Sequence, residues 1–122
     1  MENKVLALIP KYEKYMQYII EMLIKLPRTE KYSIGTMFKS SIYSTMEFIL
    51  YVDKIPNNEK LGYINKIDAE LTMQRILLRI MQKEKWIDNK KFNVAMESMY
   101  ELGKIVGGLT KYYGKNYKKW IW

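Results

Sequence analysis

Apolar residues recur along this chain at steps of three and four, which is the spacing of one face of an α-helix. Four segments carry such a stripe, and no segment alternates apolar and polar residues long enough to predict a strand. The pattern therefore predicts an all-α fold of four amphipathic helices. The stripes include Tyr12, Tyr15, Ile19 and Leu23; Phe38, Ile42, Thr45 and Ile49; Ile64, Ile67, Leu71 and Leu78; and Met96, Met99, Leu102 and Val106.

Three breakpoints separate these segments. Pro27 and Pro56 disfavour helix at the residue before each of them, and Asp88 can cap a helix that follows it. Pro10 is tolerated only near a helix start, so we expect the first helix to begin there. Short connections place consecutive helices antiparallel, which predicts an up-down-up-down four-helix bundle. We expect one domain over residues 1–122, with helices at 10–26, 30–54, 58–85 and 89–113 and a basic, aromatic tail at 114–122.

Composition narrows the choice of partners. The 122 residues are 48% hydrophobic, enough for one core, and 21 Lys and Arg against 13 Asp and Glu leave a net charge of +8. That charge favours a polyanion such as nucleic acid, although it also serves solubility. No uncharged stretch approaches the ~18 residues of a membrane span, and the apolar run before Pro10 is too short for a signal peptide. We expect a cytoplasmic protein. The alternative is a membrane-surface protein whose Lys118–Trp122 end lies at the lipid interface.

The sequence offers little for catalysis. It contains no histidine and no cysteine, which removes the commonest general base, the commonest metal ligand and the thiol nucleophile. Gly107 and Gly108 lie inside a predicted helix rather than in a phosphate-binding loop after a strand. We therefore expect a protein that is not an enzyme, with no metal, cofactor or small-molecule substrate.

The third predicted helix carries a polar face formed by Asp68, Thr72, Arg75, Arg79 and Lys83, which recur at steps of three or four. Arginine is rare in this lysine-rich chain, so each retained arginine suggests a geometric role. The two arginines can contact phosphates or form salt bridges within the protein, as Arg75 would with Asp68. Both alternatives remain open at this point.

The fourth predicted helix contains Gly103, Gly107 and Gly108. Each glycine in a helix interior costs about 1 kcal/mol relative to alanine, so three of them need a reason. One reason is close approach of another backbone, within the bundle or across a subunit boundary. The alternative is a helix end at Gly107 and Gly108, but the apolar stripe continues through Leu109 to Tyr113 and favours a continuous helix.

The last twelve residues contain lysines among aromatic residues, and no acid. The lysines are Lys111, Lys115, Lys118 and Lys119. Such lysines can meet phosphates while tyrosine and tryptophan rings stack on bases. Alternatively, the rings close an apolar edge between subunits, and the sequence does not separate these two interpretations.

Three segments resemble the accessory variability determinant family, the small basic four-helix proteins of diversity-generating retroelements, which are related to four-helix proteins of intervening sequences in bacterial ribosomal RNA. The resemblance spans roughly residues 10–111. In its most specific segment, Gly103, Lys104, Gly107 and Gly108 match the family pattern, whereas Leu109 stands where tryptophan is usual. The segments are LPRTEKYSIGTMF from Leu26, DAELTMQRILLRI from Asp68 and ELGKIVGGLTK from Glu101.

The resemblance implies a ring-like homopentamer that binds nucleic acid and docks a reverse transcriptase, so that template RNA is copied into mutagenised cDNA. Five copies of +8 would give the ring about +40. The alternative is an intervening-sequence-type protein with general nucleic-acid binding and no polymerase partner. The candidate residues for nucleic-acid or polymerase binding are Arg28, Lys31, Arg75, Arg79, Lys104, Lys111, Lys115, Lys118 and Lys119. The candidate residues for a helix-packing or oligomer seam are Gly103, Gly107, Gly108 and Leu109.

Overall fold

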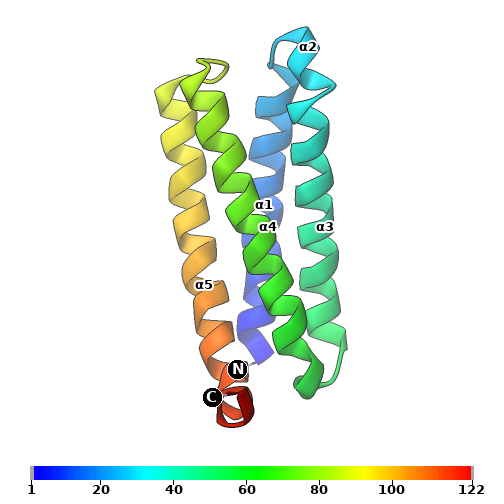
Figure 1. The fold of residues 1–122 in the computed structure, drawn as a ribbon. Helices are drawn as coiled ribbons and strands as arrows, with labels where there is room; N and C mark the ends of the chain where they lie inside the picture. Colours follow the sequence, from blue (N-terminus) through cyan, green and yellow to red (C-terminus); the bar gives the residue numbers. More distant parts are fainter. Residues whose placement is uncertain (1, 122) are drawn as a thin grey trace.

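The computed structural model describes the backbone of residues 2–121 and the side chains of residues 5–114. Its helices are α1 (Glu2–Ile24), α2 (Arg28–Lys31), α3 (Ile34–Lys54), α4 (Asn57–Lys83) and α5 (Asn89–Ile121). The four long helices lie side by side and alternate in direction, with the single turn α2 at one end of the bundle (Figure 1). The predicted antiparallel four-helix bundle is therefore confirmed.

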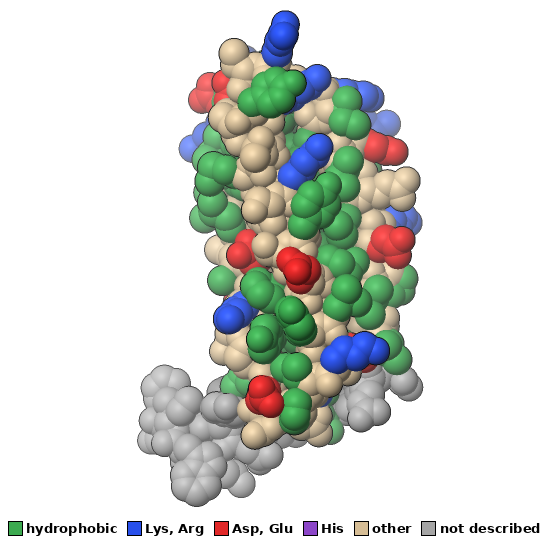
Figure 2. All heavy atoms as spheres, turned by 90° about the vertical axis from the view of Figure 1, so that its right-hand side faces the viewer, with side chains coloured by type: hydrophobic (Ala, Val, Ile, Leu, Met, Phe, Trp, Pro, Cys, Tyr) green, Lys and Arg blue, Asp and Glu red, His purple; other side chains and the backbone are tan. Residues whose placement is uncertain are grey.

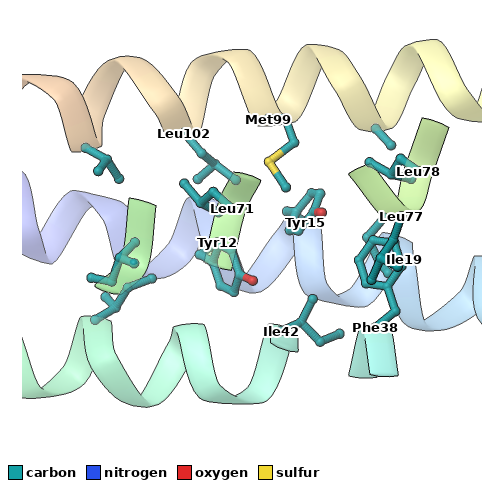
Figure 3. Close-up of a cluster of buried hydrophobic side chains, with 14 of the residues drawn as sticks. Tyr12, Tyr15, Ile19, Phe38, Ile42, Leu71, Leu77, Leu78, Met99 and Leu102 are labelled. Atoms are coloured by element: carbon teal, nitrogen blue, oxygen red, sulfur yellow. The ribbon is translucent and has the colours of Figure 1, made fainter. Parts of the chain in front are cut away.

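Each long helix packs against two neighbours, since α1 and α4 both contact α3 and α5. The apolar stripes predicted from the sequence meet in one core, where the largest side chains are almost completely excluded from solvent. Burial of these stripes provides the main driving force for folding. The cluster in Figure 3 includes Tyr12 and Tyr15 from α1, Phe38 and Ile42 from α3, Leu71 and Leu78 from α4, and Met99 and Leu102 from α5.

The predicted start of the first helix near residue 10 is wrong. Helix α1 begins at Glu2 and contains Pro10 within its length. Val5 and Leu8 are buried in the core, and their burial offsets the backbone hydrogen bond that Pro10 cannot make. Leu6 and Pro10 both lie on the exposed side, where water can satisfy the carbonyl left unpaired.

Two other predicted boundaries also need correction. The second predicted helix began at residue 30, whereas the structure has a separate turn, α2, and starts α3 at Ile34. The fourth predicted helix ended at residue 113, whereas α5 continues to Ile121. The glycines at 107 and 108 therefore lie inside a continuous helix, as the apolar stripe through Leu109 predicted.

A buried lysine secures the connection between α3 and α4. Lys60 lies in the second turn of α4, is only 6% exposed, and donates from Nζ to the backbone carbonyl of Val52 in the last turn of α3. The same Nζ lies 5.9 Å from the centroid of the Tyr113 ring of α5. A cation at a helix C-terminus satisfies a free carbonyl and opposes the helix dipole. Lys60 therefore joins three helices at this end of the bundle.

A polar network crosses the core and is centred on Gln74 of α4, which is completely buried. Its Oε1 accepts a hydrogen bond from the Tyr12 hydroxyl at 3.1 Å, and its Nε2 donates to Ser41 Oγ and Thr45 Oγ1, both at 3.0 Å. Ser41 in turn donates to Glu70 at 2.6 Å. The network ties α1 and α3 to α4 and specifies how these helices align, because a shifted register would bury unpaired polar groups.

The turn between α4 and α5 contains the only non-glycine residue with positive φ in the described part of the chain, Lys85, at 63°. Its N–H donates to the Gln82 carbonyl at 3.0 Å, and the Trp86 N–H donates to the Met81 carbonyl at 2.9 Å. This pattern is a Schellman motif, in which glycine normally occupies the position of Lys85. Asp88 Oδ1 then accepts from the Lys91 N–H at 2.8 Å, so the predicted cap of the last helix is confirmed.

Because a lysine at positive φ is strained, we expect Lys85→Gly to stabilise the protein by about 1 kcal/mol. The matched control is Lys83→Gly, two residues earlier in the last turn of α4, which should destabilise it by up to about 1 kcal/mol. Urea unfolding of both variants checks the prediction. A loss of stability in Lys85→Gly would contradict the backbone conformation described for this turn.

Candidate nucleic-acid interface

The predicted polar face of the third helix lies on the flank of α4 that faces α5. Arg75 is half-buried there; its Nη2 donates to Thr72 Oγ1 at 3.0 Å. Its Nη1 lies 3.9 Å from the point that a Cβ on Gly103 would occupy, so the guanidinium reaches across to α5. Among the described side chains Arg75 forms no ion pair, so the alternative of a salt bridge with Asp68 is not what the fold adopts.

Arg79 lies one turn further along the same flank and is exposed. Within residues 5–114 it has neither a hydrogen-bond partner nor an ion pair. A guanidinium that is free on the surface presents its fork of N–H donors to any phosphate that approaches. The two arginines therefore differ: Arg75 is held by the protein, whereas Arg79 faces outward.

Arg75 also acts on the core beneath it. Burial raises the pKa of Tyr15 well above its ordinary value of 10.0, the neighbouring Tyr12 adds to the rise, and the Arg75 cation opposes it. The Tyr15 hydroxyl is buried and has no hydrogen-bond partner among the described residues. The arginine thus lies close enough to the core for its charge to reach a buried phenol.

Helix α5 presents a lysine beside an aromatic ring. Lys104 is exposed, and its Nζ lies 4.5 Å from the centroid of Tyr100, whose side chain is 66% exposed. Lys104 directly follows Gly103, the residue toward which the Arg75 guanidinium extends. A cation over an exposed ring combines a phosphate contact with a surface on which a base can stack. We call Arg75, Arg79, Lys104 and Tyr100 the α4–α5 strip.

The remaining candidate residues are spread more widely. Arg28 and Lys31 are exposed on α2, at the end of the bundle away from the last turns of α5 that follow exposed Lys111 (Figure 1). The structure therefore does not bring these groups together within one chain. The side chains of Lys115, Lys118 and Lys119 lie outside the described residues.

Gly103 and Gly107 of α5 are not in close contact with another helix of the same chain, whereas the half-buried Gly108 lines a small hollow together with Ala7 of α1. A Cβ at Gly107 would meet nothing within 4 Å, and one at Gly103 would make only an ordinary contact with Arg75. Gly107 is exposed, whereas Leu109 is 1% exposed and packs in the core. Close approach at Gly107 within the bundle is thus absent, and contact with another subunit remains a prediction.

Ion pairs engage few of the basic side chains in residues 5–114. Those present join Lys11 to Glu101 at 3.9 Å and Lys54 to Asp53 at 3.7 Å. Exposed pairs of this kind are weak, typically below about 1 kcal/mol. Most of the lysines and arginines are therefore available to an external polyanion.

Two hollows on the surface were not anticipated from the sequence. One, of about 480 Å³, lies between α1 and α5, with Lys11, Lys14, Glu97 and Glu101 in its lining. The other, of about 720 Å³, lies at the α4–α5 turn and is rich in lysine. The lysines near Trp86 in the sequence could have indicated the second hollow. That Lys25 lies beside them depends on the fold.

Other classes of site are not apparent in the described residues. No three acidic side chains there approach one another closely enough to hold a metal ion. None of the described helical segments is both long and apolar enough to cross a membrane.

Comparison with known proteins identifies the family. A sequence model described as bAvd-like matches residues 6–113, which include most of α1, all of α2 to α4, and α5 as far as Tyr113. No characterised protein gave a match. The matched region includes the α4–α5 strip, α2 and the glycines of α5, and it takes in most of the chain. This protein therefore belongs to the bAvd-like family, the bacterial accessory variability determinants.

Proposed function

We propose that this chain is a non-catalytic accessory protein of a diversity-generating retroelement. In this role it works in the cytoplasm, binds the retroelement's reverse transcriptase, and holds template RNA and cDNA on a basic surface built by a homopentamer. Membership of the bAvd-like family supports the accessory role. The net charge of +8 and the scarcity of ion pairs in residues 5–114 support binding to a polyanion.

The α4–α5 strip is the observation that best supports contact with nucleic acid. Arg79 and Lys104 are exposed cations without acidic partners in the described part of the chain, and Tyr100 offers a ring beside Lys104. These groups recognise phosphates and base faces rather than base edges. Binding is therefore expected to be insensitive to sequence and to weaken steeply as salt concentration rises.

Exposed apolar side chains support assembly into an oligomer. Figure 2 shows hydrophobic side chains along much of the face over α3, between scattered charges. A second apolar row runs along the outer side of α4. Apolar surface of this extent commonly marks contacts between proteins. The large exposed residues are Met37, Tyr43, Leu50 and Tyr51 on α3 and Met73, Ile76 and Ile80 on α4.

The strip is tested by replacing Arg79 and Lys104 together with glutamine. We expect binding to a single-stranded RNA to weaken by about tenfold and the slope of log affinity against log salt to fall by about 1.4, for two lost phosphate contacts. Fluorescence anisotropy at several salt concentrations measures both. The matched control is Lys39→Gln with Lys54→Gln, which removes the same charge from α3. Equal effects in the two double variants would contradict the strip.

The partner and the assembly are tested separately. If a reverse transcriptase gene lies beside this one, co-expression of the two proteins should yield a stable complex. Sedimentation should give an oligomer of five subunits. A clean monomer at micromolar concentration would contradict the ring. A ribosomal RNA gene around this one, with no polymerase gene nearby, would instead favour the intervening-sequence-type function.

A further inference from the structure

A lysine-rich pocket lies where α4 turns into α5. It shares no residue with the α4–α5 strip, and its Lys83 follows Arg79 by one turn of α4. It is an open hollow of about 720 Å³. Lys25, Lys83, Lys85 and Lys91 line it together with Trp86. We call it the turn pocket. Four ammonium groups around one hollow provide a site for a multiply charged anion.

These lysines come from different parts of the fold. Lys25 directly follows α1, Lys83 ends α4, Lys85 lies in the turn, and Lys91 is in the first turn of α5. Lys25 and Lys91 also line the adjoining hollow, so the pocket continues toward the face between α1 and α5. Folding alone brings these charges together.

The charge of the turn pocket is not neutralised by nearby carboxylates. None of its four lysines forms an ion pair with a described side chain. The single acidic residue in the lining is Asp88, and its Oδ1 already accepts the backbone N–H of Lys91 at 2.8 Å. Glu21 lines the adjoining hollow together with Lys25 and Lys91. Four lysines against these two carboxylates leave a net positive charge, which a bound anion would relieve.

The turn pocket also has a defined aromatic wall. Trp86 is half-buried, and its backbone N–H is held by the Met81 carbonyl at 2.9 Å. The residue before it, Lys85, occupies a strained backbone conformation with φ of 63°, where glycine would be easier. The turn thus keeps a lysine at a position where the backbone disfavours it, next to the half-buried Trp86 side chain.

We propose that the turn pocket binds a nucleotide unit, with its phosphates on the lysines and its base against the Trp86 indole. Lysine is a point charge suited to phosphate oxygens, and a tryptophan face stacks on any base. The nucleotide is either part of a single-stranded nucleic acid or a free nucleoside triphosphate. This inference deepens the proposed nucleic-acid binding, and it rests on that function only if the nucleotide belongs to a strand.

The test compares Lys83→Gln with Lys85→Gln against the control Lys39→Gln with Lys54→Gln. Both double variants lose two charges, and neither changes a buried residue. Calorimetric titration uses ATP, inorganic tripolyphosphate, a ten-nucleotide oligothymidylate and polyglutamate. We expect the turn-pocket variant to bind ATP and the oligonucleotide about tenfold more weakly than the wild type, and the control to stay within about twofold. Thermal melting confirms that both variants are folded.

Each outcome decides the proposal. Loss of oligonucleotide binding alone assigns the pocket to a strand, and loss of ATP binding alone assigns it to a free nucleotide. Equal affinities of the two variants for both ligands would overturn the proposal, and the proposed function would stand if Arg79→Gln with Lys104→Gln still weakened RNA binding. Polyglutamate or tripolyphosphate binding as tightly as ATP would overturn the nucleotide assignment. ATP binding lost in the turn-pocket variant, without any complex with reverse transcriptase, would support the pocket and contradict the proposed function.

Discussion

Above pH 10 the free energy of unfolding is expected to fall by about 2.7 kcal/mol per pH unit from two buried tyrosines, at about 1.36 kcal/mol each. Tyr12 is 0% exposed and Tyr15 is 2% exposed. Burial raises the pKa of each phenol above its ordinary value of 10.0. The Thr45 side chain lowers the pKa of Tyr12 and the charge of Arg75 lowers the pKa of Tyr15, but burial has the larger effect on both.

The direction of the pH dependence follows from which state, folded or unfolded, binds more protons. Both tyrosines are neutral below pH 10 in the folded and unfolded chain, so their contribution is then fully present. As pH rises past 10, the unfolded chain releases both protons while the folded chain retains them. The unfolded state then binds fewer protons, and stability declines until the pH reaches the raised pKa values of the folded state.

Urea unfolding at pH 9, 10 and 11 measures this slope. Tyr12→Phe and Tyr15→Phe should each remove about half of the tyrosine contribution, which separates it from the titration of the many lysines. Tyr32→Phe is the matched control, because the Tyr32 side chain is 79% exposed. A slope that is the same in all three variants would show that the two buried phenols do not govern alkaline stability.

Replacement of Gln74 by methionine is expected to lower the free energy of unfolding by about 2 to 3 kcal/mol. Methionine has nearly the volume of glutamine, so the cost comes from hydrogen bonds rather than from a cavity. The substitution removes the acceptor of the Tyr12 hydroxyl and the donor to Ser41 and Thr45. The Tyr12 hydroxyl would then lose its acceptor, and only the Thr45 side chain would remain beside it.

A double-mutant cycle with Tyr12→Phe tests whether the lost hydrogen bond to Tyr12 causes this loss of stability. In the Tyr12→Phe background, Gln74→Met should lower the free energy of unfolding by a clearly smaller amount, because no phenol then loses its acceptor. Tyr15→Phe is the control within the same core, and at neutral pH it should be neutral or slightly stabilising because its hydroxyl already lacks a described partner. Additive effects of the Tyr12 and Gln74 substitutions would contradict the network.

The helical fold was predictable because its signals are local. Apolar residues at steps of three and four gave the core faces of all four long helices, and Asp88 gave the start of α5. The start of α1 was not predictable by the same reasoning. Pro10 disfavours a helix interior locally, but the burial of Val5 and Leu8 against other helices outweighs that penalty.

The candidate site was predictable only in part. The sequence showed that Arg75 and Arg79 share a helix face, and the structure confirms that they do. The sequence did not show that the Arg75 guanidinium extends toward Gly103 of α5 while Arg79 has no partner among the described residues. That difference depends on how α5 packs against α4. The burial of Lys60 likewise depends on the end of α3, whose Val52 carbonyl accepts from its Nζ.

By itself, the sequence determined the number of bundle helices, their core faces, the net charge and the family resemblance, since these depend on residue identity and short spacings. The tertiary structure decided which polar groups meet. Tyr12 donates to Gln74, which is 62 positions away, and Lys25 lines one hollow with the lysines around Trp86 although α2, α3 and α4 lie between them in the chain. No local spacing encodes such meetings, because they arise only when apolar faces pack and bring distant backbone segments to one place.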